Sequence, residues 1–247
     1  TLKDEFKKGG FGKITGGIGT EDRAELKGNY NKFNQKEQFS ILASVTNTGR
    51  NGLSWNDYQD FKGSNSFNWN DDGDFGFSGG GSVRYYFSED DEDNIETNFF
   101  GSSSNGFPKK YNGGLNYNYD HKKTKFSGTY FYNFDELFSE AKRSQNFLYL
   151  DNPYNTLDTA FRTNTKQSHK MDVRIEQEFD SLHSLVFKSS INIGGVQNEL
   201  DGFFTTLSPS EILLSDLSMF SQYDNNIINS QSSVIFRKKF KRKGRSL

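Results

Sequence analysis

Residues 38–47 read QFSILASVTN and residues 110–119 read KYNGGLNYNY. In both stretches the large apolar residues, apart from Leu42, fall on every second position. Successive side chains of a strand point to opposite faces, so this period of two predicts strands with one apolar and one polar face. The apolar set comprises Phe39, Ile41, Ala43, Val45, Tyr111, Leu115, Tyr117 and Tyr119.

The same alternation recurs along the chain and predicts about ten strands. They are expected at 10–19, 23–32, 38–47, 79–87, 94–101, 110–119, 125–134, 167–179, 185–194 and 230–240. Most are close to the roughly 9–11 residues that a tilted strand needs to cross a bilayer. The sequence therefore predicts an all-β fold, specifically an antiparallel transmembrane β-barrel segment filling residues 1–247.

The expected connections differ in length at the two ends of the strands. Apart from 20–22, the short connections at 33–37, 88–93, 120–124, 180–184 and 241–244 fall at one end. The longer ones at 48–78, 102–109, 135–166 and 195–229 fall at the other, which is typical of outer-membrane barrels. All three prolines, Pro108, Pro153 and Pro209, fall in these longer connections, where no N–H has to be donated to a ladder. A short surface helix is expected after the capping-box pattern SPSE at 208–211.

Composition agrees with a barrel. The hydrophobic fraction of 32% is low for a dry core, whereas the aromatic fraction of 16% is too high for a disordered chain. A barrel needs apolar side chains only where it meets lipid. We accordingly expect the following residues to face lipid: Leu26, Tyr30, Phe39, Ile41, Val45, Leu115, Tyr117, Phe126, Tyr130, Tyr132, Val173, Ile175, Phe187 and Ile191. An aromatic girdle is expected near the short turns, from Phe39, Phe87, Tyr119, Phe126, Phe179 and Phe240.

Catalytic and metal chemistry find little support in the sequence. It has no cysteine, its three histidines lack metal-ligand spacing, and no nucleophile or phosphate-binding motif is present, so we expect neither an enzyme nor a cofactor. Net charge is −2, and the basic cluster at 237–245 fits lipid headgroups better than nucleic acid. Trp55, Tyr58 and Trp69, on the first long connection, are candidates for ligand contact, although they could equally pack that loop.

Three stretches resemble the barrel of TonB-dependent receptors of the bacterial outer membrane: GFGKITGGIGTEDRAELKGNYN at 10–31, GLSWNDYQDFKG at 52–63 and KFSGTYFYN at 125–133. The resemblance implies nutrient uptake in the outer membrane of a Gram-negative bacterium, through about 22 strands of which this chain holds roughly the first half. It also implies outer-membrane lipid, a TonB-type energy-transducing system and a surface lipoprotein as partners. The family's plug, TonB-contacting segment and closing strand have no counterpart in these residues, which we therefore expect to be part of a longer protein.

Two other interpretations remain open. The barrel could be a structural or assembly component of the cell surface that binds partners through its loops. Alternation alone also fits a soluble, secreted β-sandwich with one wet face, whose loop aromatics bind glycans.

Overall fold

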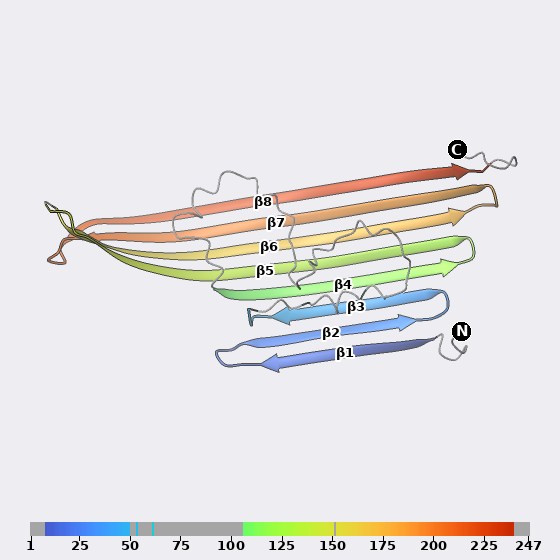
Figure 1. Cartoon of the computed structure of the whole chain (residues 1–247), viewed down its shortest axis with the longest axis horizontal. Coiled ribbons are helices and arrows are strands. Elements are labelled where there is room, and N and C mark those ends of the chain that lie inside the picture. The colour runs from blue at the N-terminus through green and yellow to red at the C-terminus, as the bar shows by residue number, and fades with distance from the viewer. Residues whose placement is uncertain (1–7, 50–52, 54–60, 62–105, 151, 240–247) are drawn as a thin grey trace.

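The residues that the structure describes form a single antiparallel sheet of eight strands in sequence order (Figure 1). A computed structural model describes residues 8–49, 53, 61, 106–150 and 152–239. Every element whose bounds are described there is a strand, so the described fold is all-β, as the alternation predicted. The strands are β1 (Gly9–Ile18), β2 (Ala24–Phe33), β3 (Glu37–Thr46), β4 (Phe107–His121), β5 (Thr124–Phe147), β6 (Tyr154–Glu178), β7 (His183–Leu207) and β8 (Leu213–Lys238).

The register gives the sheet two chemically different faces. Leu115 of β4 pairs with Ile41 of β3 and Tyr130 of β5, whereas Asn116 pairs with Ser40 and Thr129. Directly paired residues of an antiparallel ladder share a face. We call the side that holds Leu115 the apolar face and the side that holds Asn116 the polar face. All the residues expected to contact lipid lie on the apolar face.

The two ends of the sheet do not differ in connection length as much as expected: opposite the short turns, the connections 19–23, 148–153 and 208–212 between described strands are also short, and 47–106 is long. The tight turns at 34–36, 122–123 and 179–182 lie at one end, on the right of Figure 1. At the other end β5–β8 extend far beyond β1–β4 (Figure 1). They are 24 to 26 residues long, against 10 residues in β1–β3. We call the part of β5–β8 beyond Phe134, Gln167, Gly195 and Asn226 the projection.

The projection corrects two predictions, because 135–166 and 195–229 are hairpin strands rather than long connections. Alternation of apolar and polar residues fades there since both faces carry polar side chains. Backbone pairing nevertheless continues to Phe147↔Tyr154 and, after one register shift, to Leu207↔Leu213. Polar cross-strand contacts help to stabilise it: Arg143 Nη2 lies 2.6 Å from Asp158 Oδ2 on the neighbouring strand.

The predicted helix after Ser208 is also wrong. Glu211 N donates to Ser208 O at 2.9 Å, and Ser208 N donates to Ile212 O at 2.8 Å, which closes a hairpin turn. Pro209 occupies the second position of this turn, where its fixed φ is favoured, and Glu211 follows in the left-handed region with φ 62°. Residues expected on a helix, such as Leu213, instead begin β8.

Two further expectations concern the segment between β3 and β4. Pro108 lies within β4 rather than in a connection, and it pairs with Leu137 of β5. On the other side of β4, pairing with β3 ends at Lys110. No ladder on the β3 side therefore requires the N–H that Pro108 lacks. The strands expected at 79–87 and 94–101 fall outside the described residues. Among the described strands, β3 and β4 pair directly with each other.

A small apolar cluster covers part of the polar face. Leu42, Leu53, Phe61 and Phe131 are almost fully buried, and the rings of Phe61 and Phe131 meet edge to face at 6.1 Å. Gly114 makes this packing possible: a Cβ there would lie 2.6 Å from Phe131 Cδ2 and 2.9 Å from Phe61 Cζ. Leu53 and Phe61 thus lie on the polar side of the sheet.

Candidate functional site: a charge-free band on the apolar face

The apolar face contains a band without charged side chains. It spans 111–119 of β4 and the paired residues 126–134 of β5, 167–175 of β6 and 187–195 of β7. On this face these ranges place only tyrosine, phenylalanine, aliphatic residues, glycine, Met171, His169, Gln167 and Ser189. The span of about nine residues matches the length of a tilted membrane-crossing strand.

The polar face differs at the same height along the strands. There β6 and β7 carry Lys170, Asp172, Arg174 and Lys188. Charge is therefore excluded from one face only. The length and overall hydrophobicity of a strand are the same for both of its faces, so they cannot explain why charged side chains are absent from one face only. The difference depends on what each face contacts.

Charged residues reappear on the apolar face just beyond the band. Lys109 Nζ lies 2.8 Å from Glu136 Oε1. This pair occupies the next position on the same face after the pair of Tyr111 and Phe134. The hydrogen bond and charge of Glu136 raise the pKa of Lys109, so the lysine stays cationic there. At the short-turn edge the charges lie on the neighbouring strands, level with the band: Glu37 of β3 pairs with Tyr119, and Lys32 of β2 pairs with Phe39, which pairs with Tyr117. Charged residues of the apolar face thus flank the band at both ends.

Polar groups within the band bind one another. Tyr130 Oη lies 2.8 Å from His169 Nδ1, and the His169 ring lies 4.8 Å from that of Tyr132. Ser189 Oγ lies 2.9 Å from Ser232 Oγ on β8. Each of these polar side chains therefore has a polar partner on the same face, which lowers the cost of taking it out of water.

Aromatic rings mark both edges of the band. Tyr117 and Phe126 lie 6.0 Å apart near the short turns, and Tyr111 and Phe134 lie 5.5 Å apart at the far edge. Of the expected girdle, Phe39, Tyr119, Phe126 and Phe179 lie near the short-turn end, while Phe87 and Phe240 fall outside the described residues. The far-edge pair is an aromatic border that the sequence analysis did not identify.

The polar face is lined by amide and hydroxyl side chains, and Phe61 covers part of it. Asn116 Nδ2 donates to Phe61 O at 3.2 Å, and Thr129 Oγ1 donates to Asn116 Oδ1 at 3.1 Å. The Asn31 amide and the Ser40 hydroxyl are buried on this face, and neither has a hydrogen-bond partner among the described residues. A face built from amides and hydroxyls suits contact with water or polar ligands.

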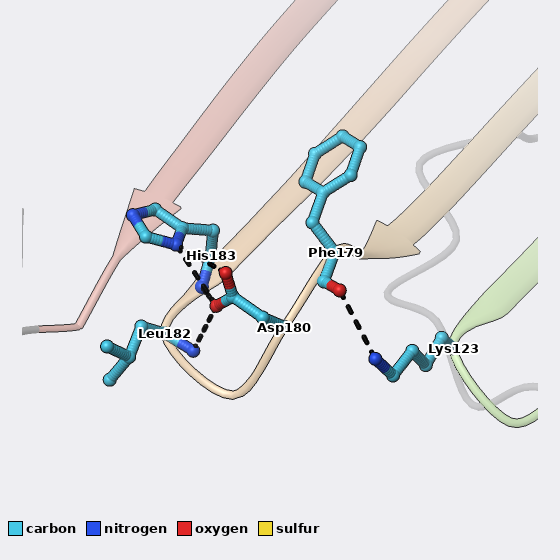
Figure 2. Close-up of polar contacts among 5 residues, drawn as sticks. All are labelled: Lys123, Phe179, Asp180, Leu182 and His183. Carbon is cyan, nitrogen blue, oxygen red and sulfur yellow. Dashed lines mark hydrogen bonds and ion pairs between the residues drawn. The ribbon is translucent and has the colours of Figure 1, made fainter.

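One short turn is fixed by a side-chain network (Figure 2). Asp180 Oδ1 accepts hydrogen bonds from Leu182 N at 2.7 Å and His183 N at 2.8 Å, and His183 Nδ1 lies 2.9 Å from Asp180 Oδ2. The His183 side chain, followed by the backbone donors, lowers the pKa of Asp180. Lys123 of the adjacent turn donates to Phe179 O at 3.2 Å, which ties the two turns together.

Several sequence-based candidates gain no support as sites. Trp55, Tyr58 and Trp69 lie outside the described residues. His121, His169 and His183 lie on different strands, and no group of three or more potential metal ligands occurs in the described part of the chain. Within that part, no helix has the length and apolar character required to span a membrane.

No protein-family model matches the sequence, and no curated protein matches it. Functional interpretation therefore depends on the geometry of the sheet.

Proposed function

We propose that this chain is part of a transmembrane β-barrel of the bacterial outer membrane, with the apolar face toward lipid and the polar face toward a wet lumen. The observation that supports this most strongly is the charge-free band, bordered by aromatic rings and then by charges. A tilt of about 40° converts its length of roughly 27 Å along the strand into a height of about 20 Å. That height is close to the apolar belt of outer-membrane barrels, about 25 Å.

Both edge strands, β1 and β8, have one side without a neighbour among the described strands. An open edge exposes unpaired N–H and C=O groups, which lipid does not tolerate. The proposed barrel therefore requires further strands to close it, in agreement with a barrel larger than these eight strands.

Resemblance to TonB-dependent receptors suggests the biological role, which is uptake of a nutrient without covalent chemistry. The polar face would line the path of the nutrient. The cluster around Phe61 and Phe131 would then lie inside the lumen, packed against this face. Energy would come from a TonB-type system, and a surface lipoprotein would be a second partner.

Site-specific labelling tests the lipid assignment. Because these 247 residues contain no cysteine, Ile193→Cys on the apolar face and Asn192→Cys on the polar face can be compared in the full-length protein in native membranes. A bimane label at 193 should be quenched by lipids carrying a doxyl group in the acyl chain, and a label at 192 by aqueous iodide. Equal aqueous quenching at both positions would rule out the barrel and favour the soluble sandwich.

A separate measurement tests the transporter role. Purified TonB carboxyl-terminal domain should form a complex with the full-length protein in detergent, detected by size-exclusion chromatography. A heat-modifiable, membrane-retained protein that forms no such complex would leave the barrel intact and favour the structural role at the cell surface.

A further inference from the structure

A second apolar feature lies on β4 and the projection, beyond the far edge of the charge-free band. Four phenylalanine rings on four successive strands form a continuous row: Phe107 to Phe138 at 6.4 Å, Phe138 to Phe161 at 6.5 Å and Phe161 to Phe203 at 6.4 Å. Phe107 is 55% exposed and Phe203 is 48% exposed. Rings in this position cannot contact lipid in the proposed barrel, since the charged border at Lys109 and Glu136 separates them from the band.

Carboxylates alternate with these rings across the strands. Glu140 pairs with Phe161, Phe161 with Asp201, and Asp201 with Phe220. Directly paired side chains on one face have Cβ atoms about 4.5–5.5 Å apart. Each of these carboxylates therefore lies beside a phenyl ring on the apolar side of the projection. We call Phe138, Glu140, Phe161, Asp201, Phe203 and Phe220 the acidic phenylalanine surface.

The charge of this surface and its border is unbalanced. The described lysines on this side, Lys109 of β4 and Lys142 of β5, each already bind a carboxylate, Glu136 at 2.8 Å and Glu140 at 2.7 Å. The border also holds Arg23, whose Cζ lies 5.2 Å from the centroid of the Phe107 ring and whose Nη1 donates to Asn47 O at 2.6 Å. Further carboxylates have no cationic partner among the described residues; they are Glu199, Asp201, Asp216 and Asp224. Three of these four accept hydrogen bonds from neutral side chains, namely Gln197, Thr205 and Gln222. The surface is thus both apolar and net negative.

We propose that the acidic phenylalanine surface binds a basic segment of a partner protein. Ammonium or guanidinium groups gain from the face of a phenyl ring and from an adjacent carboxylate at the same time. Aliphatic side chains between the basic residues would cover the exposed parts of Phe203 and Phe220, the latter 65% exposed. An anionic glycan or lipid headgroup is disfavoured because the unbalanced carboxylates repel it.

The test uses the full-length protein in a neutral maltoside detergent and a fluorescein-labelled octapeptide of alternating arginine and leucine. Fluorescence anisotropy should show saturable binding that weakens between 50 and 300 mM NaCl. Octapeptides that replace arginine by glutamate, or leucine by glycine, should bind at least about tenfold more weakly, because each lacks one of the two interactions. Equal binding of the glutamate peptide would overturn the proposal.

Variants locate the site. Asp201→Asn keeps the side-chain shape and should weaken binding about threefold, and addition of Phe220→Ser should bring the loss to about tenfold or more. The matched control combines Glu211→Gln in the β7–β8 turn with Leu217→Ser, whose side chain lies on the opposite face of β8. It should leave affinity within about twofold.

Unchanged binding by Asp201→Asn/Phe220→Ser, or equal loss in the control pair, would refute this surface as the site. Saturable binding of lipopolysaccharide micelles that the same variant abolishes, without peptide binding, would replace the protein partner by a glycolipid.

Discussion

Arginine substitution at Leu115 provides a direct measure of what the apolar face contacts. Leu115 lies four residues from Tyr111 and four from Tyr119, in the middle of the charge-free band. At about 3.3 Å per residue and a tilt of about 40°, it lies roughly 10 Å from each edge of the proposed apolar belt. An arginine at the bilayer midplane of a barrel destabilises it by about 2–4 kcal/mol, whereas one near the interface costs about 0–1 kcal/mol.

Alanine variants remove the effect of the lost side chain. At Leu115, Tyr111 and Phe107, the free energy of unfolding of the arginine variant is compared with that of the alanine variant. The arginine-minus-alanine difference should be about 2–4 kcal/mol destabilising at Leu115, below about 1 kcal/mol at Tyr111 and close to zero at Phe107. This subtraction matters because Tyr111 also loses its ring contact with Phe134.

Guanidinium titration of the full-length protein in phosphatidylcholine vesicles, followed by circular dichroism, measures these values. Leu115 is 46% exposed in the sheet. If this face met water, arginine would be tolerated there within about 0.5 kcal/mol. A flat profile over the three positions would therefore refute the lipid assignment, whereas a maximum at Leu115 would support it.

Three further substitutions test the packing of the sheet. Gly114→Val should destabilise the protein by about 1–3 kcal/mol in the same titration, since its side chain would overlap Phe131; an unchanged midpoint would contradict the packing of the polar face. Amide protection in the β6–β7 turn should be present above about pH 4 and be lost as pH falls through the lowered pKa of Asp180, and hydrogen exchange of Asp180→Asn should show no such transition. Arg143→Met should cost about 1–3 kcal/mol, because it leaves the buried Asp158 carboxylate without its cation; proteolysis confined to the projection would report the loss, and full resistance would show that the pair is dispensable.

Sequence reasoning was most accurate where one face of a strand is apolar. Leu115, Tyr130 and Ile191 could be assigned to one face from their spacing alone, and the register places them there. It failed beyond the band, where alternation is lost and backbone pairing alone extends β5–β8. The SPSE pattern at 208–211 shows the limit of local signals, because the same residues can begin a helix or close a hairpin, and pairing of β7 with β8 selected the hairpin.

The sequence by itself determined the class of secondary structure and the chemical identity of the two faces. Strand periodicity is a local property, since each side chain direction follows from its neighbour's. Tertiary structure decided which strands are neighbours, how far they extend and which residues meet across them. The direct pairing of β3 with β4 and the alternation of Glu140, Phe161, Asp201 and Phe220 across four strands depend on contacts between residues distant in sequence. Register fixes such contacts, and it is set by the pairing of whole strands rather than by any single stretch of sequence.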